Sequence, residues 1–156
     1  MENYKDPISL FKQTNFSKTI WWKLKVNISG YQNERENKLV TEICKNRIFR
    51  LLYPNIHQRT HKFSRILVQL YEDGYVCWIN LDELIIEKSE LRKTENFKNE
   101  HFFIKDKVPL IIKWIQKQSE LTNEYLWGGT LGPNFDCSGL IQTAFLKHDI
   151  NIPRDS

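Results

Sequence analysis

The spacing of apolar residues changes near residue 88, and this change limits the folds open to the chain. Between residues 19 and 87, short stretches that partly alternate apolar and polar side chains are separated by turn residues, which is typical of β-strands. After residue 105 the apolar residues recur at helical spacing. The pattern predicts an α+β chain in which a small β-barrel precedes a helical part.

The clearest strand signal is the segment SRILVQLYEDGYVCWINLDELII. Residues 66–71 alternate between two faces, and Asp73-Gly74 is a favoured hairpin turn before a return strand at residues 76–79. Cys44 and Cys77 fall within predicted strands, so we expect both side chains to lie in the core.

These patterns predict four consecutive regions. We expect an N-terminal arm with a short helix at residues 1–19, an SH3-like barrel at residues 20–87, a charged linker at residues 88–104, and a helical part at residues 105–156.

Two helices are expected in the helical part. Asp106 can cap the first helix, with Pro109 tolerated in its first turn and an end near residues 119–122. Its apolar face is predicted to comprise Val108, Ile111, Ile112 and Ile115. A second helix is expected at residues 137–147, with a buried stripe of Leu140, Ile141, Ala144 and Phe145.

Composition excludes several classes of protein. Apolar residues make up 40% and charged residues 27%, as in soluble globular proteins, and no apolar run is long enough to span a membrane. The first residues show no secretory signal, which favours the cytoplasm. Three widely spaced cysteines argue against a disulfide framework or a zinc site, and the net charge of +4 without an arginine stripe argues against a nucleic-acid partner.

Most of the chain's glycines surround one cysteine in YLWGGTLGPNFDCSGLIQTAF. Cys137 stands where an irregular loop meets a predicted helix, whose unpaired N–H groups stabilise a thiolate and an oxyanion. Asp136 can cap that helix, while Ser138 and Gly139 keep its first turn small enough for a substrate to approach. The alternative is that Cys137 is a small buried side chain beside a turn.

Three stretches resemble known families. Residues 125–129 (YLWGG) with 136–140 (DCSGL) resemble the catalytic segment of NlpC/P60 cysteine peptidases, and residues 152–156 (IPRDS) resemble the Pro-Arg segment that follows the nucleophile helix there. EDGY at residues 72–75 with Trp78 resembles a bacterial SH3 domain. The pairing is similar to the cyanobacterial-type γ-D-glutamyl-L-diamino acid endopeptidases, and implies a barrel followed by the N-terminal helical portion of a papain-like domain.

The resemblance implies a reaction, a substrate and a pocket. Cys137 would attack the γ-D-Glu carbonyl of a peptidoglycan stem peptide, with its own backbone N–H in the oxyanion hole and with no metal or cofactor. Members with the barrel bind the free amine of a terminal L-Ala. The positions that match this pocket are Tyr75, Tyr125, Asp136, Ser138, Asp155 and Ser156.

Simpler roles stay open for several of these residues. Asp136 can be a helix cap alone, Asp155 can be solvated, and Tyr75 can merely flank a turn. For Arg154 we expect pairing with a carboxylate of the fold instead of contact with substrate.

The general base is the missing part. In the family it is a His on a strand after the nucleophile helix, whereas this chain ends at Ser156. His57 and His61 lack further ligands for a metal, His101 falls in the predicted linker, and His148 is about three helical turns from Cys137, at about 1.5 Å per residue. Two amphipathic helices also lack a sheet to pack on, so we expect an inactive fragment of a longer hydrolase or a product cut short.

Two other functions remain open at this point. The chain can be a non-catalytic module that binds cell-wall peptide, or a thiol acyltransferase or amidase on the same plan. The reactivity of the Cys137 thiol distinguishes the first alternative from a peptidase, and analysis of products distinguishes the second. The sequence does not indicate an oligomeric state.

Overall fold

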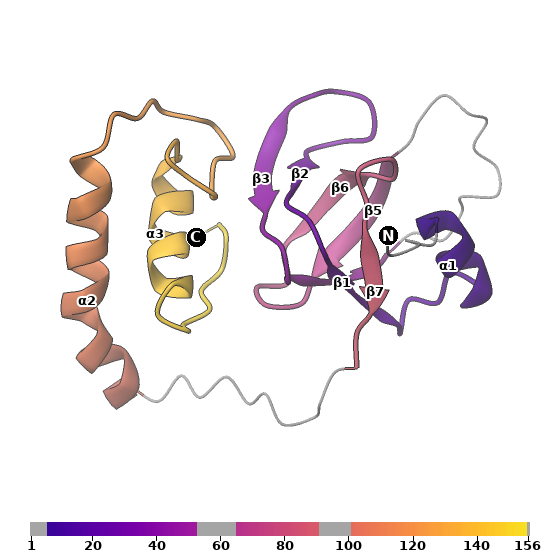
Figure 1. The fold of residues 1–156 in the computed structure, drawn as a ribbon, viewed down its shortest axis with the longest axis horizontal. Helices are drawn as coiled ribbons and strands as arrows, with labels where there is room; N and C mark the ends of the chain where they lie inside the picture. The colour runs from indigo at the N-terminus through magenta and orange to yellow at the C-terminus, as the bar shows by residue number, and fades with distance from the viewer. Residues whose placement is uncertain (1–5, 53–64, 91–100, 156) are drawn as a thin grey trace, which may run out of the picture. The chain divides into compact units, whose positions relative to one another are not determined.

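The structure is a computed structural model that describes residues 6–52, 65–90 and 101–155, with the backbone alone at residues 101–103. The chain divides between residues 91 and 92 into two compact units (Figure 1). We call them the sheet unit and the helical unit. The assignment of these regions to an arm, a barrel domain, a linker and a catalytic domain stays a prediction.

The sheet unit contains one seven-stranded antiparallel sheet in the order β3-β2-β6-β5-β4-β1-β7. Its strands are β1 (Trp21–Leu24), β2 (Ile28–Tyr31), β3 (Leu39–Ile43), β4 (Ile48–Leu51), β5 (Arg65–Leu70), β6 (Val76–Asn80) and β7 (Ile86–Lys88). Among the described residues, β3 and β7 are edge strands that do not pair with each other. The sheet is therefore open, and the closed SH3-like barrel expected from the sequence is not confirmed.

The predicted hairpin is present as β5 and β6. Val68 pairs with Cys77, and the turn between the strands contains Gly74 at φ +70°, a conformation that favours glycine. Cys77 is buried as expected. The expectation for Cys44 is wrong, because this residue follows the end of β3 and is only half-buried.

The N-terminal segment contributes to the core of the sheet unit. Helix α1 (Pro7–Gln13) is capped by Asp6, whose carboxylate accepts the N–H groups of Ile8 and Ser9. Phe11 on this helix is fully buried and packs edge-to-face on Trp22, with ring centroids 5.2 Å apart. The short helix was expected, and Phe11 anchors it to the core of the sheet unit.

A buried arginine holds the turn between β5 and β6. Arg47 donates to Glu72 at 3.2 Å and forms an ion pair with Asp73 at 2.8 Å, and Glu72 also accepts the backbone N–H of Ile48. Burial opposes the charge of Arg47, but the two carboxylates outweigh it and raise the pKa of the guanidinium. The acidic pair in the EDGY segment thus has a structural role in fixing the turn.

The helical unit consists of α2 (His101–Ser119), α3 (Cys137–Leu146) and the segments that connect and follow them (Figure 1). The two helices lie side by side, and their small core is formed by Ile111, Ala144 and Ile150. Helix α2 begins within the predicted linker instead of at Asp106, so Pro109 is internal to it. Its end at Ser119 and the start of α3 at Cys137 agree with the sequence prediction.

The predicted apolar faces are partly wrong. Val108 is 39% exposed, Ile112 49% and Ile141 41%, although Ile141 was predicted to lie in a buried stripe and the other two on the apolar face of the first helix. Helix α2 instead turns Ile111 toward α3, flanked by Trp114 and Ile115. A single packed neighbour requires only a narrow stripe, so Val108, Ile112 and Ile141 stay exposed.

No described helix combines the length and apolar character required to cross a bilayer.

Candidate active site

Cys137 is the first residue of α3, and its side chain is exposed. It borders a cavity of about 330 Å³ between the C-terminal end of α2 and the start of α3. The lining residues are Ile115, Gln118, Ser119, Asn123, Glu124, Tyr125, Pro133, Phe135, Asp136, Cys137 and Leu140. An accessible thiol at a helix N-terminus beside a cavity can act as a nucleophile toward a bound ligand.

Asp136 caps the helix that carries Cys137. Its Oδ1 accepts the N–H of Gly139 at 2.6 Å, as an N-cap residue does, and its Oδ2 accepts the N–H of Gly128 at 2.8 Å. One carboxylate therefore ties the glycine-rich loop to the first turn of α3, which fixes where the nucleophile stands.

Arg154 completes this arrangement from the end of the described chain. Its guanidinium bonds both oxygens of Asp136, at 3.1 Å and 2.6 Å, and also donates to the hydroxyl of Ser138. Only 3% of Arg154 and 8% of Asp136 are exposed. The expectation that Arg154 pairs with a carboxylate of the fold is confirmed, and this buried pair is the main polar link in the helical unit.

The carboxyl group of Asp136 is held in its charged form. Burial by itself would raise the pKa of Asp136, but hydrogen bonds from Arg154, Gly139 and Gly128 outweigh burial and lower it. Asp136 is thus a stable anion whose charge is balanced by Arg154.

The glycines around Cys137 serve packing between backbone segments. A Cβ on Gly139 would collide with the carbonyl oxygen of Gly129, and a Cβ on Gly129 would lie 2.5 Å from the carbonyl oxygen of Asn134. Gly128 adopts φ +80°. The missing side chain of Gly139 makes room for the loop, and the expectation that it also leaves room for a substrate stays a prediction.

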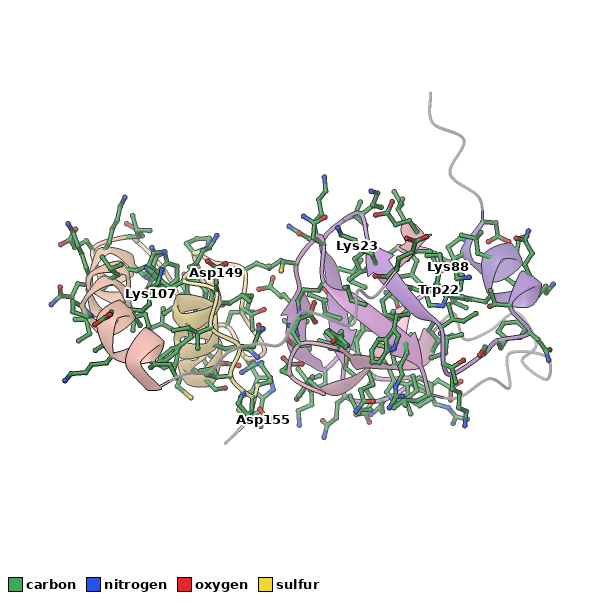
Figure 2. The ribbon with its side chains drawn as sticks, turned by 90° about the horizontal axis from the view of Figure 1, so that it is seen from below. Trp22, Lys23, Lys88, Lys107, Asp149 and Asp155 are labelled. Atoms are coloured by element: carbon green, nitrogen blue, oxygen red, sulfur yellow. The ribbon has the colours of Figure 1, made fainter. Side chains whose placement is uncertain are left out.

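The structure brings some of the predicted site residues together. Tyr125 and Asp136 line the cavity with Cys137, while Ser138 donates to Asp136 at 3.2 Å. Asp155 is exposed at the surface of the same unit, where Figure 2 labels it. Ser156 lies outside the described residues and Tyr75 belongs to the sheet unit, so the roles proposed for these two residues stay predictions.

Two polar residues of α3 escaped the sequence reasoning. Gln142 is buried and donates to the carbonyl of Ile152 at 3.2 Å, and Thr143 donates to the carbonyl of Thr130 at 2.6 Å. They hold the segments on either side of α3. The sequence offered one indication of this role, because Gln142 is a polar residue between the apolar positions of a short helix.

No histidine lines the cavity within the described part of the chain. His148 follows α3, and its Nδ1 lies 2.8 Å from the carbonyl oxygen of Ala144, so it serves the C-terminal end of that helix. His57 and His61 lie outside the described residues, and the side chain of His101 is not described. The described residues also contain no cluster of His, Cys, Asp or Glu that could hold a metal ion.

Comparison with known proteins points to one family. Residues 122–156 match the NlpC/P60 family. A curated relative, the gamma-D-glutamyl-L-lysine dipeptidyl-peptidase of Bacillus cereus, is 56% identical over 32 residues, which is 20% of this chain and 10% of that protein. The family match at residues 122–156 contains the glycine-rich loop, Cys137 and Arg154, so this part of the chain resembles a peptidase family.

Two solved structures are also similar. NlpC2 from Trichomonas vaginalis matches at 18% identity and a TM-score of 0.33, covering 86% of this chain and 43% of that one. An NlpC/P60 family protein from Bacillus cereus matches at 21% identity and a TM-score of 0.29, covering 93% and 41%. The chain thus spans a tenth of the curated relative and less than half of each solved structure.

Proposed function

We propose that Cys137 is the nucleophile of a cysteine peptidase that acts on peptidoglycan stem peptides. The observation that carries the proposal is the exposed thiol at the start of α3, beside a cavity, within the segment that matches the NlpC/P60 family. The buried pair of Asp136 and Arg154 supports it, because this pair fixes the helix terminus at which the thiol stands.

The geometry supports a two-step acyl transfer. The Cys137 thiolate attacks the carbonyl carbon, and the oxyanion that forms is stabilised by unpaired N–H groups of the first turn of α3, including that of Cys137. The C–N bond then breaks, the amine leaves with a proton, and a thioester remains on Cys137. Water attacks the thioester, which releases the acid and restores the thiol.

The bond proposed for cleavage joins γ-D-Glu to a diamino acid, in a peptide with a free L-Ala N-terminus. The relative named as a γ-D-glutamyl-L-lysine dipeptidyl-peptidase supports this choice of bond. Tyr125, at 66% exposure on the cavity wall, is available to a ligand. Contacts of the peptide with Tyr75, Asp155 and Ser156, and a cytoplasmic location, are further parts of the proposal.

We propose that the 156-residue chain by itself does not hydrolyse the peptide. Both steps require a base and an acid near the thiol, and none of the described residues that line the cavity is an imidazole. A chain of this kind can still bind peptide, which keeps a non-catalytic cell-wall-peptide binding module as the second candidate function.

Peptide hydrolysis tests the proposal. L-Ala-γ-D-Glu-L-Lys is incubated with the 156-residue chain, with a chain extended to the stop codon of its gene, and with the Cys137→Ser variant of the extended chain. Release of L-Ala-γ-D-Glu is expected from the extended chain only. Turnover by the 156-residue chain would contradict the proposed inactivity, and failure of the extended chain would contradict the peptidase assignment.

A further inference from the structure

Helix α3 lies along one side of α2 (Figure 1), and a neighbouring side of α2 is exposed. We call this side the Ile112 face, and it consists of Lys105, Val108, Pro109, Ile112, Gln116 and, directly after the helix, Glu120. All of these residues are exposed, and at 3.6 residues per turn they fall within an arc of about 120°. Val108 and Ile112, at 39% and 49% exposure, form its apolar centre with Pro109.

The two ends of the Ile112 face have opposite charges. Lys105 lies near the start of α2 and Glu120 directly follows its last residue, with Ile112 about midway between them. The two charged residues are about 22 Å apart at about 1.5 Å per residue, so they cannot pair within one chain. Neither forms an ion pair with another residue that the structure describes. Both charges are therefore available to a partner with opposite charges at the same spacing.

A second copy of the chain has charges at this spacing when its α2 runs antiparallel. A two-fold axis at Ile112 places this residue on its counterpart, and places Lys105 of one protomer opposite Glu120 of its partner. The flank of the face repeats the pattern, because Asp106 and Lys117 are exposed at nearly equal distances on either side of Ile112. A parallel pair would instead place like charges together, so the face is complementary to itself in the antiparallel orientation.

We propose that the Ile112 face is an interface between two copies of this chain, paired antiparallel through α2. The inference goes beyond the proposed function, because the face includes neither Cys137 nor any residue that lines its cavity. Asp106 and Glu120 favour a second copy over an anionic membrane surface, which would repel both carboxylates. One helix pair buries less than the roughly 1,200–2,000 Å² of stable complexes, so we expect a reversible dimer with a dissociation constant in the micromolar range.

Sedimentation velocity of the 156-residue chain in reducing buffer, over a series of concentrations, tests the inference. Ile112→Ser removes the apolar centre, and the matched control is Leu110→Ser. Leu110 is as exposed as Ile112, at 49%, but lies about 160° away around the helix. We expect Ile112→Ser to raise the dissociation constant by about tenfold or more, because each protomer loses an apolar side chain at the axis. Leu110→Ser should leave the dissociation constant unchanged.

Charge exchange tests the antiparallel orientation. Lys105→Glu places two carboxylates opposite each other and should raise the dissociation constant about fivefold, as for loss of partly exposed ion pairs. The double variant of Lys105→Glu with Glu120→Lys restores opposite charges across the interface and should restore the affinity. Lys113→Gln should strengthen the dimer, because Lys113 follows Ile112 and its two copies come close at the axis.

Four results would overturn the inference. The first is a chain that stays monomeric at every concentration up to the millimolar range, and the second is an equal effect of Ile112→Ser and Leu110→Ser. The third is failure of the double charge exchange to restore association. The fourth is a monomeric chain that binds vesicles of phosphatidylglycerol, which would assign the face to a membrane surface. Failure of the peptidase proposal would appear elsewhere, as absence of peptide hydrolysis by the extended chain.

Discussion

The sheet unit and the helical unit are stabilised in different ways. In the sheet unit, fully buried apolar side chains such as Phe11, Phe49 and Leu51 form a continuous core beneath paired strands. In the helical unit the apolar core is limited to Ile111, Ala144 and Ile150, with partly buried neighbours. The pair of Asp136 and Arg154 and the backbone contacts at glycine supplement it.

This difference shows that the candidate site belongs to the unit with less apolar packing. The residues that position Cys137 are bonded to each other through polar groups, whereas the sheet unit relies on the burial of hydrocarbon. The predictions below test this contrast, from the largest expected effect to the smallest, and each is read unit by unit from hydrogen–deuterium exchange.

Truncation of a core side chain in the sheet unit should have the largest effect. Phe49 is fully buried on β4, so Phe49→Ala should lower the free energy of unfolding of the sheet unit by about 3–5 kcal/mol. Exchange in peptides from β4 and β5 measures this loss. A loss below about 1 kcal/mol would mean that apolar packing does not dominate that unit.

Removal of the buried arginine should affect the helical unit almost as strongly. Arg154→Met leaves the buried carboxylate of Asp136 without its partner, which costs about 3–5 kcal/mol in comparable buried pairs. Exchange in peptides from α3 reports the loss. The matched control is Lys25→Met, because the pair of Lys25 and Glu87 is partly exposed and should contribute below about 1 kcal/mol.

Substitution of Gly139 by Ala should change stability in the direction opposite to the same substitution at an exposed helical position. At an exposed helical position, Gly→Ala would stabilise by about 1 kcal/mol. Here the new Cβ meets the carbonyl oxygen of Gly129, so overpacking should win and Gly139→Ala should destabilise the helical unit by about 1–3 kcal/mol. Stabilisation by this substitution would show that the loop does not pack on the first turn of α3.

The two units should also respond to opposite ends of the pH range. The pKa of Asp136 is lowered in the folded protein. Its contribution to the stability of the helical unit is therefore complete above the ordinary pKa of 3.8 and is lost as the pH falls through the folded pKa. Burial raises the pKa of the Cys77 thiol to about 12. Its contribution to the stability of the sheet unit is therefore complete below the ordinary pKa of 9.0 and is lost as the pH rises toward 12.

Exchange measured at acid and alkaline pH separates these responses. Acid should loosen α3 first, and alkali should loosen β6 first. Cys77→Ala should flatten the alkaline response and leave the acid response in place. The same acid response in both units would contradict the assignment of this effect to Asp136.

The sequence predicted features that depend on local pattern. The hairpin of β5 and β6 follows from the two-residue alternation of residues 66–71 and from Asp73-Gly74, and the start of α3 follows from Asp136 as a capping residue. The pairing of Arg154 with a carboxylate of the fold was also expected, whereas its burial was not predicted.

The features that the sequence missed depend on contacts between distant segments. The start of α2 was missed because the charged residues before Asp106 were interpreted as a linker, although Ile104 precedes Val108 and Ile111 at helical spacing and packs on the core of the helical unit. The role of Gly139 depends on Gly129, ten residues earlier, and the burial of Gln142 depends on the carbonyl of Ile152. Helical periodicity contains no information about such partners.

The central claim is that the fold makes Cys137 a reactive nucleophile, and its alkylation rate tests this claim most directly. The rate with iodoacetamide at pH 6 is measured by mass spectrometry for Cys137 in the native chain and in the chain unfolded in guanidinium chloride, with Cys44 as an internal reference. Exposure alone can at best equal the rate in the unfolded chain. We expect Cys137 to react faster in the native chain than in the unfolded one, because its thiol is exposed at the start of α3, beside a cavity that can hold the reagent close to the sulfur. An equal or slower native rate would contradict the account.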